Sequence, residues 1–268
     1  MKRGKFIVAR AAGSRWEVAR SELQAASDRS MTAMPKPVAI DRLELGIAPH
    51  RWPFAEAWRD EIDAHFATRC RAVPNLWNGR VLLMNDVAVA GGVVRGTFFE
   101  TGFADFLAWR DWGFPDRSVV NCFAMAALRA SDGAYLLGVM STFTANPGRI
   151  YFPAGTPDPS DLRGDTVDLL GNVLRELGEE TGLGAQDLLA APDWTAVVAG
   201  PRIALMKEVR ARWPAAELRA SILGHLASEA RPELADMWIV RSPADFDPAM
   251  PEFVTAYLSH VWSLDGAR

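Results

Sequence analysis

Three glutamates within one short stretch are the residues of this chain best suited to chemistry. Glu176, Glu179 and Glu180 stand at positions i, i+3 and i+4, so a helix would bring their carboxylates onto one face. Like charges at this spacing repel, at a cost of about 0.2–0.5 kcal/mol per pair. A divalent cation such as Mg²⁺ reverses that effect, because it binds carboxylate oxygens together with water and phosphate oxygens. The pattern indicates a metal site, with a solvated acidic helix face as the alternative.

The segment around these glutamates has the spacing of an amphipathic helix over residues 167–181. Gly182 follows it and suits the left-handed conformation that closes a helix. Arg175 stands four residues before Glu179, where its guanidinium can orient carboxylates by hydrogen bonding. A separate apolar stripe at i, i+3, i+4 and i+7 would bury the other face: Leu170, Val173, Leu174 and Leu177.

Strands and helices alternate along the rest of the chain. Apolar alternation bounded by turn residues predicts strands at 38–45, 80–84, 93–99, 119–128, 134–141, 149–152, 194–198, 203–210 and 237–241. Helical spacing predicts further helices at 54–69, 103–112, 215–229 and 251–263. This interleaving predicts an α/β (α+β) fold with a layered core.

Composition and charge exclude several classes of protein. The 268 residues are 49% hydrophobic and 23% charged, which is typical of a globular chain and not of collagen, a coiled coil or a disordered protein. The net charge of −4 argues against nucleic-acid or membrane-surface partners, which require a basic field. Two cysteines, Cys70 and Cys122, cannot form a disulfide framework or a thiolate metal cluster. They favour a reducing compartment, and we predict a cytoplasmic protein.

Residues 1–34 form a basic segment that differs from the rest. Its apolar stretch at 6–9 is shorter than the roughly 7–15 residues of a signal peptide core, and its three acidic residues argue against a transit peptide. We expect a mobile tail or an over-long gene start. Only 4 of the 29 basic residues are lysine, which indicates a GC-rich bacterial genome.

The string from Arg175 to Leu183, Arg-Glu-Leu-Gly-Glu-Glu-Thr-Gly-Leu, resembles the end of the Nudix box, Arg-Glu-U-x-Glu-Glu-x-Gly-U, where U is aliphatic. Five fixed and two aliphatic residues match without a gap, which happens by chance in about one chain of this length in ten thousand. The resemblance implies a Nudix-type α/β/α sandwich around a mixed sheet, with an N-terminal extension.

The front half of the box departs from the family pattern. By strict spacing, the family's glycine and first glutamate fall on Asp161 and Val167. The nearest glycine is Gly155, which ends a Phe-Pro-Ala-Gly string and would make the box about six residues longer than usual. Asp168 stands one place late for the missing glutamate but seven residues before Arg175, which puts it on the same side of the helix as Arg175, about 20° away. It either takes that residue's arginine-pairing role or is an N-terminal helix residue favoured by the helix dipole.

Nudix enzymes hydrolyse a nucleoside diphosphate linked to another group, X, using a divalent metal. The resemblance implies Mg²⁺, with Mn²⁺ as a substitute, and metal ligands at Glu176, Glu179 and Glu180. Glu176 is implied either as a ligand or as the holder of the attacking water, and Arg175 as part of the catalytic set. Some members use a general base from a later loop, and the candidates here are Glu208, Glu229, Glu233 and Glu252. We favour Glu233, which precedes a predicted strand.

The resemblance leaves the group X open. Residues 76–79 and 103–107 faintly resemble an animal Nudix protein that acts on UDP-sugars, while coenzyme A, ADP-ribose and dinucleoside polyphosphates are alternatives. The implied partner is a small nucleotide, and a homodimer is compatible with a family in which many members are dimers. The alternative function is a Nudix-fold nucleotide-binding or regulatory protein without turnover, which the altered front half of the box would fit.

Residues 116–268 suffice for the Nudix domain, which leaves 35–115 as an N-terminal subdomain or lid that selects X. Half of the 10 tryptophans fall in this segment, and we expect them to pack a core in preference to stacking on a base: Trp52, Trp58, Trp77, Trp109 and Trp112.

Overall fold

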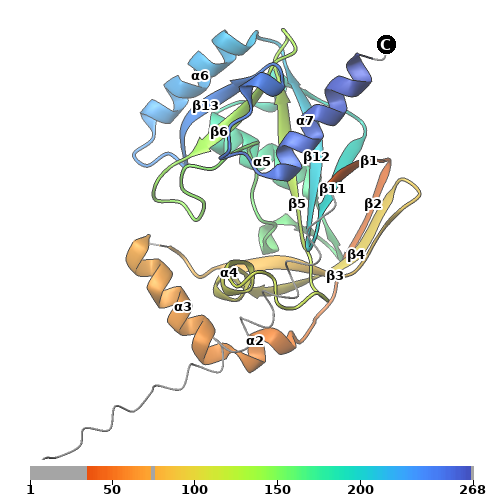
Figure 1. The fold of residues 1–268 in the computed structure, drawn as a ribbon, viewed down its shortest axis with the longest axis vertical. Helices are drawn as coiled ribbons and strands as arrows, with labels where there is room; N and C mark the ends of the chain where they lie inside the picture. The colour runs from red at the N-terminus through yellow and green to blue at the C-terminus, as the bar shows by residue number, and fades with distance from the viewer. Residues whose placement is uncertain (1–34, 74–75, 267–268) are drawn as a thin grey trace, which may run out of the picture.

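The computed structural model describes residues 35–73 and 76–266, which form two mixed β-sheets with helices packed against them (Figure 1). The expected basic tail, 1–34, lies outside the described residues. No described helix combines the length and apolar character needed to cross a bilayer.

The larger sheet has eight strands within the described part of the chain and occupies the upper part of Figure 1. Its order is β1-β11-β12-β5-β6-β13, with β10 paired to β12 and β7 paired to β6. β5 and β12 run parallel, and the other pairs are antiparallel. The strands are β1 (Lys36–Ile40), β5 (Asn121–Arg129), β6 (Tyr135–Met140), β7 (Ile150–Tyr151), β10 (Leu188–Ala190), β11 (Trp194–Ala199), β12 (Arg202–Ala211) and β13 (Leu234–Val240).

Helices cover both faces of this sheet. Along β5, Cys122 and Ala124 enter one core while Met125 and Ala127 enter another, because successive strand residues point to opposite faces. The first core includes apolar residues of α5 (Leu169–Thr181) and α6 (Ala215–Ser228), and the second those of α7 (Glu252–Asp265). The predicted α/β (α+β) class, with helices on both faces of a mixed sheet, is therefore confirmed.

The smaller sheet has five strands within the described residues, in the order β3-β4-β2-β9-β8. These are β2 (Arg42–Ile47), β3 (Arg80–Ala90), β4 (Val93–Gly102), β8 (Leu162–Arg163) and β9 (Thr166–Val167). One face joins the first core of the larger sheet, and the other packs with α2 (Pro53–Ala57), α3 (Arg59–Ala72) and α4 (Phe103–Asp111) around the buried Trp109. These three helices lie in the lower part of Figure 1.

The two sheets exchange strands. The predicted strand 38–45 is in fact two strands, because the chain bends at Asp41, whose backbone N–H donates to the carbonyl of Gly92 at 2.8 Å. β1 therefore joins the larger sheet and β2 the smaller one. In the other direction, β8 and β9 belong to the segment between Gly155 and α5 but extend the smaller sheet. The extra residues of the box are thus folded onto the N-terminal part.

The other predicted elements are present, with ends shifted by a few residues. The predicted helix 54–69 is two helices, α2 and α3, which break at Trp58. Sequence patterns missed the two-residue strands β8 and β9, three-residue β10, and the 3₁₀ turns η1 (Pro159–Asp161), η2 (Ala185–Asp187) and η3 (Pro243–Asp245). Such short elements carry no measurable periodicity.

Candidate active site

Helix α5 carries the three glutamates, and a hydrogen bond caps each of its ends. The Asp168 carboxylate accepts a hydrogen bond from the backbone N–H of Gly171 at 2.9 Å, so Asp168 is the N-cap. Gly182 ends the helix with a φ of 71°, and its N–H donates to the Gly178 carbonyl at 2.8 Å. The helix begins two residues after the predicted start at 167.

Asp168 does not pair with Arg175, which corrects the arginine-pairing alternative. Its charged neighbour is Arg163, at 3.9 Å. Because the carboxylate is used to cap the helix, it stays at the first turn and cannot reach the guanidinium two turns further on. The second alternative, a residue that stabilises the helix N-terminus, describes it correctly.

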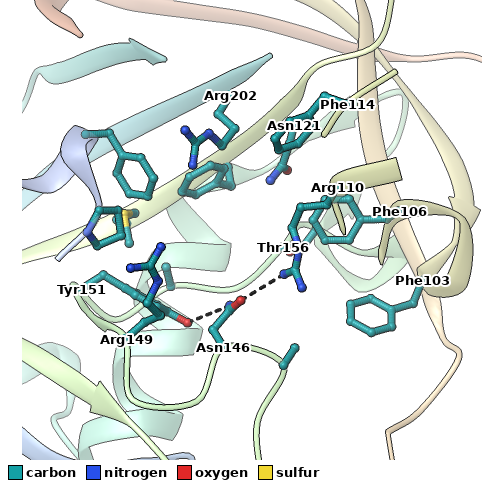
Figure 2. Close-up of a pocket in the computed structure, with 16 residues that line it drawn as sticks. Phe103, Phe106, Arg110, Phe114, Asn121, Asn146, Arg149, Tyr151, Thr156 and Arg202 are labelled. Atoms are coloured by element: carbon teal, nitrogen blue, oxygen red, sulfur yellow. Dashed lines mark hydrogen bonds between the residues drawn. The ribbon is translucent and has the colours of Figure 1, made fainter. Parts of the chain in front are cut away.

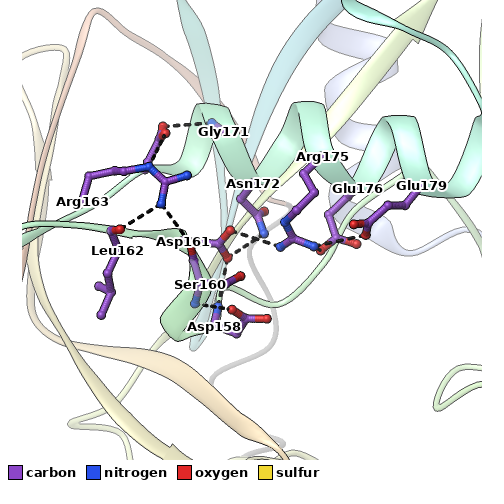
Figure 3. A network of polar contacts seen from close by, with 11 residues as sticks. Asp158, Ser160, Asp161, Leu162, Arg163, Gly171, Asn172, Arg175, Glu176 and Glu179 are labelled. Atoms are coloured by element: carbon purple, nitrogen blue, oxygen red, sulfur yellow. Dashed lines mark hydrogen bonds and ion pairs between the residues drawn. The ribbon is translucent and has the colours of Figure 1, made fainter.

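Asp161 is the residue that holds Arg175 (Figure 3). Its carboxylate, on a residue 3% exposed, lies 3.1 Å from one terminal nitrogen of Arg175 and accepts a hydrogen bond from the amide of Asn172 at 2.9 Å. The backbone N–H of Asp158 donates to the same carboxylate at 3.0 Å. Asp161 therefore fixes the guanidinium from outside the helix, through the turn η1.

The other terminal nitrogen of Arg175 faces the glutamates. It lies 2.8 Å from a Glu176 oxygen and 3.2 Å from a Glu179 oxygen (Figure 3). Arg175 thus joins a buried carboxylate on one side to two glutamates of α5 on the other. This arrangement fixes the orientation of Glu176 and partly neutralises the acidic face.

Burial and mutual repulsion set the protonation of the glutamates. Burial raises the pKa of Glu176 to about 7, against the lowering effect of Arg175 and with added repulsion from Glu179 and Glu233. Burial also raises the pKa of Glu180 well above its usual value, with repulsion from Glu176 and Glu233. Glu179 lies at the solvent side, with its side chain 61% exposed.

Glu233 lies within the range over which its charge and those of the α5 glutamates repel one another. It stands immediately before β13, and the Ser141 N–H donates to its backbone carbonyl at 2.8 Å. Its own pKa is raised by desolvation and by Glu179 and Glu229. Each of the other candidate bases has a side-chain partner: Glu208 contacts Tyr135 and Arg129, Glu229 contacts His225, and Glu252 contacts Arg202.

The donor set suits a hard divalent cation bound mainly through water and phosphate. Among the residues that the structure describes, one oxygen of Glu180 is buried without a hydrogen-bond partner, and Glu180 itself is 5% exposed. A carboxylate in this state needs a cation or a proton. No group of three or more His, Cys, Asp or Glu side chains among the described residues could hold a metal by itself. Mg²⁺ does not need such a cage, because it commonly uses one or two carboxylates plus substrate phosphates and water.

Gly155 gives Glu176 the space that it occupies. A Cβ built on Gly155 would lie 2.2 Å from one oxygen of the Glu176 carboxylate, closer than any real contact. The side chain that would have to move is the one that Arg175 orients. Gly155 therefore acts on the site by having no side chain, rather than by any bond that it makes.

Gly155→Ala is expected to lower catalytic turnover by about tenfold while leaving the fold intact, because displaced catalytic groups lose their geometry faster than the protein loses stability. The measurement is kcat together with the thermal unfolding temperature. Gly224→Ala is the matched control, since a Cβ there meets nothing within 4 Å. Equal turnover in both variants would contradict a role for Gly155.

Asp161→Asn is expected to lower turnover by about tenfold, because residues that orient metal ligands typically contribute 10–100-fold. Asp168→Asn is the matched control: asparagine caps helices as well as aspartate does, so turnover should stay near that of the wild type. If Asp168→Asn were the more damaging change, the assignment of Arg175 to Asp161 would be wrong.

A cavity of about 430 Å³ lies next to this site (Figure 2). The segment that leads toward α5 lines the cavity with Tyr151, Ala154 and Thr156. The backbone N–H of Ala154 also hydrogen-bonds Glu180 and favours its charged form, so the cavity and the glutamates share this residue. The remaining wall is aromatic and basic, and comes from α4 and the residues after it, β5, the loop before β7, the start of β12 and α7. Its principal side chains are Phe103, Phe106, Phe114, Phe123, Phe253, Arg110, Arg149, Arg202 and Asn121.

Four of the five tryptophans of residues 35–115 pack a core, and none of the five lines this cavity. Trp52, Trp109 and Trp112 are buried in the cluster beneath α2–α4, and Trp58 packs against it. Trp77 differs, being 78% exposed. The expected core packing is therefore confirmed for four of the five, and phenylalanines form the aromatic surface of the cavity. No sequence pattern singled out Phe114, Asn121 or Arg202.

Comparison with known proteins gives similarity at the level of structure only. No protein-family model matches the chain, and no curated protein does. A Nudix hydrolase from M. smegmatis, RenU, is similar with 16% identity and a TM-score of 0.34, over 55% of this chain and 84% of that one. The Bacillus subtilis pyrophosphohydrolase BsRppH is similar with 13% identity and a TM-score of 0.33, over 53% of this chain and 78% of that one.

Proposed function

We propose that this chain is a Nudix-type, divalent-metal-dependent hydrolase that cleaves the diphosphate of a nucleoside diphosphate linked to another group. The observation that carries the proposal is the pairing of a box-like sequence with its geometry. Arg175 is fixed by Asp161 and faces Glu176 and Glu179, while a buried oxygen of Glu180 lacks a partner. A cavity lined by three arginines adjoins these carboxylates.

Each residue of the site has a role under this proposal. A bound Mg²⁺, or Mn²⁺ in its place, would neutralise charge on the diphosphate oxygens and lower the pKa of a bound water. Glu176, Glu179 and Glu180 would hold the metal, and Arg175 would keep Glu176 oriented. Glu233 would accept the proton of the attacking water. The guanidiniums of the cavity would bind the charged end of the substrate, since arginine matches phosphate geometry.

The non-catalytic alternative draws its support from the altered front half of the box. The structure weakens that support, because Asp161 supplies the contact to Arg175 that the missing glutamate would have made. The six-residue expansion changes the source of this carboxylate without removing it. We therefore favour an enzyme over a nucleotide-binding or regulatory protein. The free cysteines support a reducing, cytoplasmic location.

The proposal is tested with a panel of nucleotide-sugars, coenzyme A, ADP-ribose and dinucleoside polyphosphates, with Mg²⁺ and with EDTA. We expect release of phosphate esters from at least one class, abolished by EDTA, because water attack on a diphosphate needs the charge stabilisation that a metal supplies. Mg²⁺ should also raise the thermal unfolding temperature of the wild type, since a ligand that binds only the folded state stabilises it. Nucleotide binding without turnover on any class would support the regulatory alternative.

A further inference from the structure

Tyr151 carries a phenol hydroxyl on the segment between the cavity and the carboxylates of α5. It belongs to the two-residue strand β7, lines the cavity and packs against both cores of the larger sheet. We propose that Tyr151 is a further catalytic residue, whose O–H donates a hydrogen bond to a phosphate oxygen of the diphosphate during hydrolysis. This inference rests on the proposed function for the identity of the reacting group.

The direction of each hydrogen bond around Tyr151 follows from what its neighbours can donate. Arg110 of α4 carries only donors, so its guanidinium faces the side-chain oxygen of Asn146, at 3.0 Å. The amide nitrogen of Asn146 therefore faces Tyr151 and donates to the phenol oxygen at 3.2 Å (Figure 2). Because the phenol oxygen accepts in this contact, the hydroxyl proton of Tyr151 is left for donation to another group.

The Tyr151 hydroxyl lies within the range over which the carboxylate charges of the site act. Burial raises the pKa of Tyr151 well above its usual value, against the lowering effect of the Asn146 hydrogen bond and with added repulsion from Glu180 and Glu233. Tyr151 therefore stays protonated at neutral and mildly alkaline pH. A phenol in this state is a neutral donor, which can contact a phosphate oxygen without bringing a further charge into the site.

The segment from Tyr151 to Gly155 connects the cavity to the glutamates of α5. Tyr151 and Ala154 both line the cavity. The Ala154 N–H hydrogen-bonds Glu180, and a Cβ on Gly155 would lie 2.2 Å from an oxygen of Glu176, so the same segment lies against the carboxylates. A diphosphate that reaches from the cavity to the glutamates would pass along this segment, within reach of the Tyr151 hydroxyl.

Arg110 strengthens the Tyr151 hydroxyl as a donor through Asn146. The Arg110 guanidinium is held by Asp111 at 3.1 Å, and its charge polarises the Asn146 side chain that it contacts. Hydrogen bonds in a chain reinforce one another, because a group that accepts one bond becomes a better donor of the next. Since Arg110 belongs to α4, this relay makes the N-terminal part of the chain a contributor to the reaction itself.

The Tyr151 hydrogen bond acts on charge that increases during hydrolysis. Water attacks one phosphorus, the bond from this phosphorus to the bridging oxygen breaks, and the electron pair of that bond stays on the leaving oxygen. The proton of the attacking water passes to Glu233 under the proposed function, and Tyr151 keeps its own proton throughout. A donor to the phosphate that gains charge stabilises the transition state more than the bound substrate, so its effect falls on kcat.

Tyr151→Phe removes the hydroxyl and keeps the ring that packs against both cores, so the fold should be retained. We expect kcat to fall by about thirtyfold and KM to stay within about twofold, because one donor to a developing oxyanion contributes about 10²–10³-fold where no metal shares the charge. Asn146→Ala should lower kcat by about threefold, since it weakens the Tyr151 donor without removing it. Tyr135→Phe is the matched control and should keep the wild-type kcat: the Tyr135 hydroxyl is bound to Glu208 at 2.9 Å, and Tyr135 does not line the cavity.

A second measurement needs no turnover. The chain holds three tyrosines, so protein made with 3-fluorotyrosine gives three ¹⁹F resonances, which are assigned by replacing each tyrosine in turn with phenylalanine. The probe is methylenediphosphonate with Mg²⁺, a diphosphate analogue in which a carbon replaces the bridging oxygen and prevents hydrolysis. We expect the probe to shift the Tyr151 resonance and to leave those of Tyr135 and Tyr257 in place, because neither of these two lines the cavity.

The two measurements separate this inference from the proposed function. In an active wild type, a Tyr151→Phe variant with unchanged kcat, or with a defect confined to KM, would make Tyr151 part of the cavity wall only. A Tyr151 resonance that does not move while calorimetry shows the probe to bind would overturn the inference as well. A wild type without turnover whose Tyr151 resonance still responds would overturn the proposed function and leave Tyr151 as a phosphate ligand. Absence of both turnover and probe binding would overturn the two together.

Discussion

Glu180→Gln is expected to lower turnover by about a thousandfold and, in the metal-free protein, to raise stability. Under the proposed function Glu180 would be a metal ligand, and its loss would remove several kcal/mol of charge stabilisation from the transition state, where about 4 kcal/mol corresponds to a thousandfold. In the absence of metal, the same carboxylate is a liability: it is 5% exposed, lies among like charges and has an oxygen without a partner. A neutral amide of the same shape should raise the free energy of unfolding by about 1 kcal/mol.

The two effects are measured by steady-state kinetics with Mg²⁺ and by urea unfolding in EDTA. Glu179→Gln provides the comparison, because its side chain is 61% exposed. It should reduce turnover with almost no change in the stability of the metal-free protein. In addition, Mg²⁺ should raise the unfolding temperature of the wild type and fail to do so for Glu180→Gln. A Glu180→Gln protein that is both active and unaltered in stability would contradict a role for Glu180 in holding a metal.

The part of the site that α5 carries, Arg175 and the three glutamates, was predictable from sequence because it lies within one helix. Residue spacing along a helix converts directly into direction around it, so Arg175 and the glutamates could be placed on one face. The structure keeps that arrangement, with Arg175 in contact with Glu176 and Glu179. Gly155 was found differently, from the resemblance of its short string to the family pattern, and only the coordinates show that it leaves room for Glu176.

The part of the site that precedes α5 was not predictable, because a loop lies between Gly155 and the helix. The segment between Gly155 and α5 forms the turn η1 and a small hairpin, β8 and β9, that joins the smaller sheet, and loop geometry cannot be read from periodicity. Asp161 therefore looked like a mismatch at the family's glycine position, and Asp168 looked like the substitute. Three-dimensional contacts reverse the two roles: Asp161 holds Arg175, and Asp168 caps the helix. The cavity was likewise invisible, since its walls come from segments far apart in the chain.

Glu233→Gln is expected to lower kcat by about a hundredfold without weakening Mg²⁺ or nucleotide binding. A general base typically contributes 10²–10⁴-fold to a hydrolysis, and glutamine keeps the shape while losing the ability to accept a proton. The proposal of Glu233 draws on its charge repulsion with Glu176 and Glu180 and on its backbone carbonyl, which accepts a hydrogen bond from the Ser141 N–H. The measurement is kcat at saturating substrate, with Mg²⁺ affinity determined separately.

Glu229→Gln separates a chemical role of Glu233 from a general effect of charge in the same region. Glu229 also repels Glu233, but its carboxylate lies 3.3 Å from His225. Removing the charge of Glu229 should change kcat by less than about twofold, because solvent and salt largely screen a carboxylate at the protein surface. Equal losses in the two variants would indicate an electrostatic effect. An unchanged kcat in Glu233→Gln would instead favour Glu176 as the residue that holds the attacking water.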